Sequence, residues 1–160
     1  MQKVEVLEAF IAHFKTALAQ SVESAKVAHE AATHEESRAE DRHDTFAIES
    51  SYLAHGQAKR ASELVLALQE FERYLANQAP VNTAKPGTLI LLEEEGDEKP
   101  SWTFLAQNGG GTMIQVQGKK VLLVTLRSPM GEALEGLSVG DSFEVETKSE
   151  LRAYSILNLC

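Results

Sequence analysis

The chain has 160 residues, of which 43% are hydrophobic and 24% are charged, so its composition suits a folded protein with a packed core. Its formal net charge is −9. This charge argues against a broad basic surface for duplex nucleic acid, because such binding depends on many lysine and arginine side chains that neutralise phosphates. We expect no sequence-specific DNA binding.

The single cysteine, Cys160, permits no disulfide within the chain, which favours the reducing cytoplasm as the location. The first 14 residues place Glu5 and Glu8 among apolar residues and do not resemble a signal peptide. No run approaches the ~18 apolar residues that a membrane helix needs, so we expect no membrane partner.

Residues 3–78 contain no proline and a single glycine, Gly56, and are rich in residues that favour helices. Large apolar residues recur three and four positions apart, and smaller residues continue the spacing, at Val4, Leu7, Ile11, Phe14, Leu18, Ser21, Ala25, Ala28 and Ala32. The mirror image of this pattern runs backwards through Leu75, Phe71, Leu68, Leu64, Ala61, Gln57, Ala54, Ser50 and Ala47. Such spacing is typical of a coiled-coil seam.

The mirrored order of large and small residues predicts an antiparallel helical hairpin that turns near residues 34–44. Large residues of the two helices then meet near the open end of the hairpin. Small residues meet near the turn, where they let the helices approach closely. With ~1.5 Å per residue, arms of about 30 residues form a rod of roughly 45 Å. We assign residues 1–78 to this coiled coil.

A different pattern follows a linker at 79–87, which contains two prolines and a glycine. Short apolar runs separated by turn signals predict about five strands, at 88–94, 101–107, 121–127, 142–147 and 151–159. A short helix is expected at 128–137, where Ser128 suits the N-cap and Pro129 the first helical position. The predicted fold class is therefore α+β, with an antiparallel sheet and one short helix in residues 88–160.

The stretch HEESRAEDRHD, residues 34–44, contains five carboxylates where one predicted helix passes into the next. Two interpretations stay open from the residues alone. The stretch is either an ordinary solvated connection or the functional point of a slim probe that enters a narrow channel. In the second case its carboxylates suit Mg²⁺, which binds few protein oxygens and keeps water or phosphate in its other positions.

Three histidines, His29, His34 and His43, lie in or beside this stretch and raise the alternative of a metal-binding protein with a histidine–carboxylate site. His29 and His34 are five positions apart, whereas the zinc-protease motif needs a spacing of four so that both rings share one helical face. Surface histidines are the simpler interpretation.

Other motifs do not indicate catalysis. The glycine-rich run NGGGT, residues 108–112, lacks the Lys-Ser/Thr that follows a phosphate-binding loop, and it does not open a helix. It is better interpreted as a connection between strands. No nucleophile–base constellation is apparent, so we expect no enzymatic activity of the chain on its own.

The segment SPMGEALEGLSVGDSFEVE, residues 128–146, is the most distinctive in the sequence. It resembles a stretch of the form S-P-x-G-x-A-L-x-G-x-x-V-G-D in the Gre family of bacterial transcription elongation factors. The resemblance covers nearly the whole chain in the same domain order. It implies an N-terminal antiparallel coiled coil followed by a C-terminal domain of FKBP-like fold.

The resemblance also implies a partner, RNA polymerase. In the Gre family the C-terminal domain docks at the rim of the polymerase secondary channel, and the coiled coil reaches the active centre. The corresponding docking residues here are Ser128, Pro129, Met130 and Gly131. Contact with transcript RNA is then expected only within the polymerase complex.

The acidic residues that the resemblance places at the active centre are Glu36, Glu40, Asp41 and Asp44. Tip carboxylates of Gre factors help the polymerase hold a second Mg²⁺, and the polymerase itself then cleaves backtracked RNA. By this resemblance Glu40 and Asp41 would share Mg²⁺ with the polymerase. The free protein is expected to bind no cofactor.

The tip differs from the motif of Gre cleavage factors, which has the form G-D-x-S-E-N-A. Glu40 falls on the motif Glu and Asp41 on the Asn, but Ser37 stands where the motif has Asp, and the glycine is missing. Glu36 is one position away from the place of that Asp. The sequence therefore leaves two forms of the Gre-like function open: stimulation of cleavage, and occupation of the channel by a regulator without cleavage activity.

Overall fold

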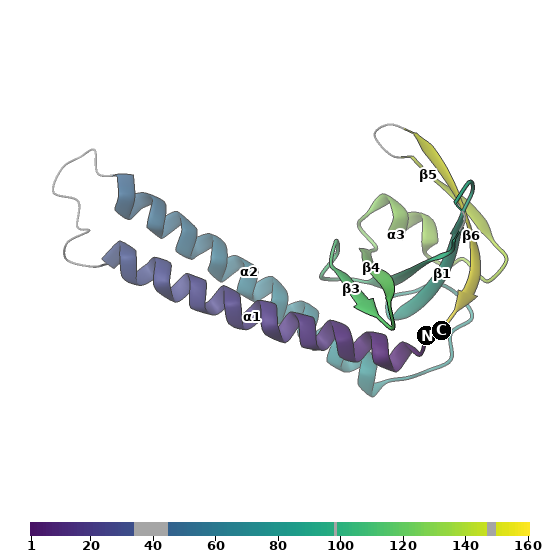
Figure 1. Ribbon diagram of the computed structural model, residues 1–160, viewed down its shortest axis with the longest axis horizontal. Coiled ribbons are helices and arrows are strands. Elements are labelled where there is room, and N and C mark those ends of the chain that lie inside the picture. The colour runs from purple at the N-terminus through teal and green to yellow at the C-terminus, as the bar shows by residue number, and fades with distance from the viewer. Residues whose placement is uncertain (34–44, 98, 147–149) are drawn as a thin grey trace. The chain divides into compact units, whose positions relative to one another are not determined.

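The computed structural model describes residues 1–33, 45–97, 99–146 and 150–160, without the side chains of 31–33 and 45–51. Two long helices come first, followed by a sheet and one short helix (Figure 1). The elements are α1 (Lys3–Thr33), α2 (Thr45–Ala76), β1 (Thr88–Glu94), β2 (Ser101–Ala106), β3 (Met113–Val116), β4 (Lys119–Thr125), α3 (Pro129–Leu134), β5 (Ser142–Glu146) and β6 (Leu151–Leu159). The predicted α+β class, with a helix pair before a sheet and one short helix, is confirmed.

Contacts between residues divide the chain into two compact units. One unit comprises residues 13–68, and the other joins residues 1–12 to residues 69–160. The N-terminal end of α1 and the C-terminal end of α2 therefore belong to the unit that contains the sheet. The stretch predicted as a linker, 79–87, lies between the end of α2 and the start of β1.

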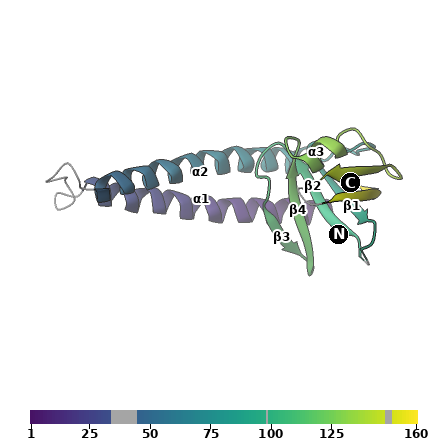
Figure 2. The ribbon, with the colours of Figure 1, turned by 90° about the horizontal axis from the view of Figure 1, so that it is seen from above.

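The unit of residues 13–68 is a pair of antiparallel helices, which Figure 2 shows side by side. Their contact follows the predicted seam, since Phe14, Ser21 and Ala28 are buried. The hydroxyl of Ser21 donates hydrogen bonds to the backbone oxygen and to the side-chain Oε1 of Gln57, at 3.0 and 3.2 Å. Small seam residues therefore bring the helices close enough for direct polar contact between them.

Within the part of the chain that the structure describes, the sheet has six strands in the order β3-β4-β2-β1-β6-β5. Four neighbouring pairs are antiparallel, but β2 and β4 are parallel, so the sheet is mixed and differs in this pair from the antiparallel sheet that we expected. The reason is the short strand β3, which the sequence analysis did not predict. Because β3 forms a hairpin with β4 at the edge, β4 returns in the direction of β2.

The core of the second unit has two parts. The first lies between the sheet and α3 and includes Ile90, Leu105, Leu134 and Ile156. The second is a group of aromatic rings in which Phe10, Phe71 and Phe104 have centroids 5.0 to 5.8 Å apart. These rings come from α1, α2 and β2, so they attach the helix ends of this unit to its sheet.

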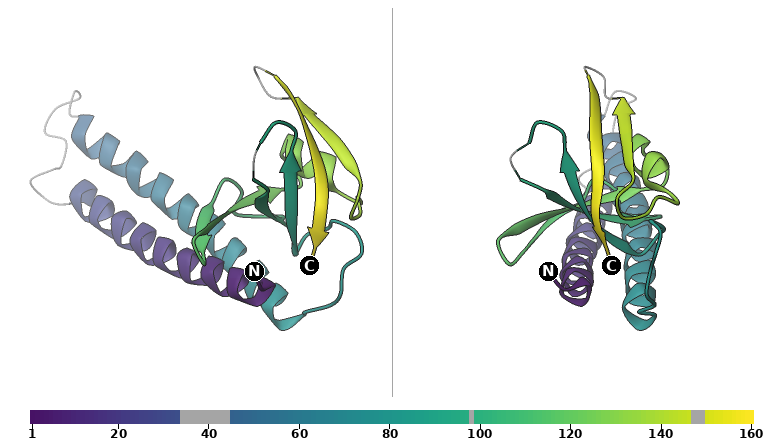
Figure 3. Two further views of the ribbon diagram at one scale, coloured as in Figure 1. Left: turned by 45° about the vertical axis from the view of Figure 1, so that its right-hand side comes forward. Right: turned by 90° about the vertical axis from the view of Figure 1, so that its right-hand side faces the viewer.

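The two ends of the chain lie near each other in this second unit (Figure 3). Cys160 continues the pairing of β6 with β1, since its backbone N–H and oxygen pair with Leu89 of β1 at 2.9 and 2.8 Å. The connection between α2 and β1 is also fixed, because Ala84 is buried and exchanges backbone hydrogen bonds with Gly136 and Leu137. The strands and the helix ends are thus bound into one compact body.

Candidate functional site

The turn between β4 and α3 contains the residues predicted for docking. Ser128 is the N-cap of α3, and its hydroxyl accepts a hydrogen bond from the Gly131 N–H at 3.2 Å. The same hydroxyl donates to the backbone oxygen of Thr125 at 2.7 Å. Pro129 occupies the first turn of the helix, where its missing N–H costs nothing.

Gly131 is required by a close approach of the backbone. A Cβ atom at this position would lie 1.9 Å from the backbone oxygen of Thr125, which no side chain can tolerate. Ser128 and Gly131 therefore have structural roles within the turn: Ser128 caps the helix, and Gly131 permits the close approach to Thr125. The other two predicted docking residues are available to a partner, since Pro129 is exposed and Met130 is partly exposed.

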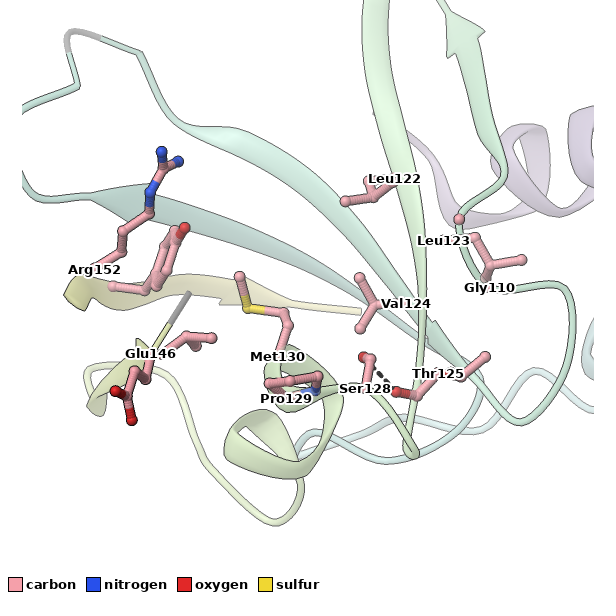
Figure 4. Close-up of a pocket in the computed structure, with 13 residues that line it drawn as sticks. Gly110, Leu122, Leu123, Val124, Thr125, Ser128, Pro129, Met130, Glu146 and Arg152 are labelled. Carbon is pink, nitrogen blue, oxygen red and sulfur yellow. Dashed lines mark hydrogen bonds between the residues drawn. The ribbon is translucent and has the colours of Figure 1, made fainter. Parts of the chain in front are cut away.

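A cavity of about 690 Å³ opens beside this turn. Its wall combines side chains of β4, the start of α3, β5 and β6 with two glycines of the β2–β3 loop (Figure 4). The lining residues are Gly110, Gly111, Leu122, Leu123, Val124, Thr125, Ser128, Pro129, Met130, Val145, Glu146, Arg152 and Tyr154. We refer to this cavity as the SPMG pocket. Its size and largely apolar wall suit one or two large side chains of a partner.

The SPMG pocket has a polar rim on the β6 side. Arg152 forms an ion pair with Glu94 at 3.2 Å, and its Nε donates to Glu150 at 2.7 Å. The ring of Tyr154 stacks on Phe143 with centroids 5.4 Å apart. Burial, followed by the hydrogen bond to the Glu94 carboxylate, raises the pKa of Tyr154.

A buried carboxylate holds the β2–β3 loop, residues 107–112. Glu70 of α2 is 5% exposed, and its Oε1 accepts from the backbone N–H of Gln107 at 2.8 Å. Its Oε2 accepts from the backbone N–H and the side-chain amide of Asn108, at 2.9 and 2.7 Å. The Tyr74 hydroxyl donates to Oε1 as well. Burial, followed by the hydrogen bond to Glu70, raises the pKa of Tyr74.

The sequence analysis missed Glu70. In sequence it looks like the exposed acids Glu63 and Glu72 of the same helix. A weak signal exists, because Glu70 precedes the seam residue Phe71 and so lies at the border of the apolar face. Its partners include the backbone N–H groups of Gln107 and Asn108, just after β2, which no residue pattern identifies in advance.

The predicted tip residues Glu36, Glu40, Asp41 and Asp44 lie outside the described residues, as do His34 and His43. His29 is exposed. Among the residues that the structure describes, no group of three histidine, cysteine or acidic side chains is arranged to hold a metal ion. Within the same residues, no helix combines the length and the apolar character needed to cross a membrane.

Comparison with solved structures finds neighbours that are Gre-type factors. The GreA factor homolog 1 (Gfh1) of Thermus thermophilus is 15% identical with a TM-score of 0.38, and the match covers 95% of each chain. Gfh1 of Thermus aquaticus is 14% identical with a TM-score of 0.37, over 99% of this chain and 96% of that one. A prokaryotic transcription elongation factor GreA/GreB from Nitrosomonas europaea is 17% identical with a TM-score of 0.38, over 64% of this chain and 92% of that one.

No protein-family model matches the chain, and no curated protein matches it. The identities to the solved structures are below 25% and the TM-scores below 0.5. The functional proposal therefore rests on the residues and the geometry of this chain itself.

Proposed function

We propose that this chain is a Gre-like transcription factor that binds bacterial RNA polymerase at its secondary channel and acts in the cytoplasm. The observation that carries the proposal is the turn of residues 128–131, which we call the SPMG turn. It forms one side of a largely apolar pocket, in a chain that also has two long paired helices. An acidic connection, residues 34–44, joins those helices. This combination of a docking surface and a pair of long helices suits a protein that modifies the work of a larger enzyme.

The proposed docking surface is the SPMG pocket with Pro129 and Met130 on its wall. Two roles are assigned within the motif. Ser128 and Gly131 fold the turn, because one caps the helix and the other permits the close approach to Thr125. Pro129 and Met130 contact the polymerase, since Pro129 is exposed, Met130 is partly exposed, and neither side chain is needed to fold the turn.

The proposed role of the acidic connection is to enter the polymerase active centre. Glu36, Glu40, Asp41 and Asp44 supply carboxylates, and Glu40 and Asp41 are the candidates to share a Mg²⁺ ion with the polymerase. The factor would have no catalytic activity alone. Because Ser37 stands at the place of a motif acid, occupation of the channel is favoured over stimulation of cleavage.

Retention of the chain on immobilised polymerase core tests the docking. We expect the wild-type protein to be retained, together with a Gre factor used as a positive control. Loss of this chain under conditions that retain the Gre factor would overturn the proposal.

A backtracked transcription complex tests what the bound factor does. Cleavage of the RNA 3′ end is compared for wild type and for the Glu40→Gln and Asp41→Asn variants, with Glu63→Gln as a control on the exposed surface of α2. A cleavage factor accelerates cleavage, and both tip variants lose the acceleration. A channel-occupying regulator slows elongation without accelerating cleavage.

Calorimetry with Mg²⁺ and Zn²⁺ on the free protein separates this proposal from a metal-binding protein. A tip that needs the polymerase to complete its ligand set should bind either ion weakly. Binding tighter than about 1 μM would instead indicate a preformed site.

A further inference from the structure

The β2–β3 loop, residues 107–112, connects the buried carboxylate of Glu70 to the SPMG pocket. At its start, Gln107 and Asn108 donate three hydrogen bonds to Glu70, between 2.7 and 2.9 Å. Two residues further on, Gly110 and Gly111 line the pocket. One short loop thus touches both the end of α2 and the proposed docking surface.

The loop is difficult to order by itself. It contains three consecutive glycines, and Gly109 and Gly111 adopt positive φ angles of 81° and 82°. Glycine loses more conformational freedom on ordering than any other residue. A glycine-rich loop therefore needs contacts with other parts of the protein to stay in one conformation.

These contacts come from two sides. At the far end of the loop, the Gly111 N–H donates to the Leu123 oxygen at 2.9 Å and the Leu123 N–H donates to the Thr112 oxygen at 2.8 Å. In the middle, Gly110 lies against Thr125, where an added Cβ would be 2.8 Å from the threonine methyl group. At the near end, Glu70 is the acceptor that fixes the backbone of the first two residues.

We propose that Glu70 is a positioning residue for docking. Through Gln107 and Asn108 it holds the loop glycines that line the SPMG pocket, Gly110 and Gly111, in the conformation that a partner meets. Glu70 does not line the pocket, so its effect on binding passes through the loop. The consequence for the partner rests on the proposed function, whereas the effect on the loop is a property of the free protein.

The isosteric variant Glu70→Gln tests this on the free protein. The amide keeps one acceptor oxygen but places an NH₂ donor against backbone N–H donors, so part of the network is lost. Amide exchange should accelerate by about tenfold or more at Gln107, Asn108 and the three glycines, the loss expected for a hydrogen bond to a charged group. Exchange in β1 and β6 should be unchanged.

Met130 provides a direct probe of the pocket. The chain has three methionines, so methyl-labelled methionine gives three signals. The Met130 signal should shift in Glu70→Gln, while the Met1 signal stays in place. The variant Asn108→Ala removes only the 2.7 Å side-chain bond and should produce smaller changes in the same direction. Glu63→Gln, on the exposed surface of α2, should produce none.

Affinity for polymerase core completes the test. Glu70→Gln should weaken binding by about tenfold at a temperature where it is folded, and Glu63→Gln should not. Unchanged loop exchange together with an unchanged Met130 signal would overturn the inference. So would equal acceleration of exchange in the loop, β1 and β6, because that result marks a purely structural residue. If wild type fails to bind polymerase, the proposed function is wrong, and the exchange data still decide the role of Glu70.

Discussion

Gly131 and Thr125 approach so closely that a Cβ atom on Gly131 would lie 1.9 Å from the Thr125 backbone oxygen. The glycine of the SPMG turn is therefore set by the packing of α3 against the end of β4. We expect Gly131→Ala to lower the free energy of unfolding by about 2–4 kcal/mol, because the helix must move to accept the methyl group. Urea unfolding followed by circular dichroism measures the change.

Gly56 is the matched control for this prediction. It lies inside α2, and an added Cβ would meet no atom within 4 Å. Gly56→Ala should therefore raise stability by about 0.5–1 kcal/mol, since alanine favours helices more than glycine does. Equal effects of the two substitutions would contradict the packing that we describe.

Ser128 tests the capping of α3 separately. Ser128→Ala removes the acceptor of the Gly131 N–H and should cost about 1 kcal/mol of unfolding free energy. Ser128→Asp keeps an acceptor at the N-cap and should retain most of that stability. If alanine and aspartate behave alike in thermal unfolding, the hydroxyl does not cap the helix.

The raised pKa of Tyr74 predicts that the folded protein loses stability at alkaline pH. Its pKa is raised in the folded protein by burial and by Glu70, so the folded state keeps the proton that the unfolded state releases. Stability from this residue is therefore complete below pH about 10, the ordinary tyrosine pKa, and decreases as the pH rises above it. Tyr74→Phe should cost about 1–2 kcal/mol at neutral pH and make the alkaline decrease shallower.

Urea unfolding at several pH values between 7 and about 11.5 checks this dependence. Tyr52, which is 75% exposed, supplies the control, and Tyr52→Phe should leave the slope as in wild type. Part of the slope should remain in Tyr74→Phe, since burial also raises the pKa of Tyr154 and Cys160. Identical slopes in wild type and Tyr74→Phe would refute the assignment.

Substitution of Ser21 tests the close approach of α1 and α2 at this position. It is 4% exposed and donates to Gln57 across the seam. Ser21→Leu should cost about 1–3 kcal/mol, because a larger side chain separates the helices and removes the hydrogen bond. Ser24→Leu, at an exposed position nearby, should change stability by less than about 0.5 kcal/mol. A tolerated leucine at position 21 would mean that the helices are farther apart there.

Local patterns explain which parts of the fold were predictable. The seam of Leu7, Phe14 and Phe71 follows from the spacing of apolar residues, since a helix can bury only one face. The start of α3 follows from Ser128 and Pro129, because capping depends on neighbouring residues alone. In both cases the information lies within a few turns of chain.

Non-local contacts explain what was missed. The short strand β3 has only four residues, and pairing it with β4 makes β2 and β4 parallel, which the separate runs do not reveal. Glu70 is buried because Gln107 and Asn108 offer N–H donors 37 and 38 positions later in the chain. Apart from its place beside the seam residue Phe71, nothing near Glu70 in the sequence distinguishes it from an exposed glutamate.

The affinity of polymerase core for two methionine variants tests docking through the SPMG pocket most directly. Met130 lines the pocket, whereas Met113 is 53% exposed on the edge strand β3 and does not line it. With core immobilised and binding followed by interferometry, we predict that Met130→Asp weakens binding by about tenfold or more, as expected for a central interface residue. Met113→Asp should remain within about twofold of wild type. Equal affinities of wild type and Met130→Asp would contradict docking through this pocket, and no binding of wild type beside a bound Gre factor would contradict the proposed function as a whole.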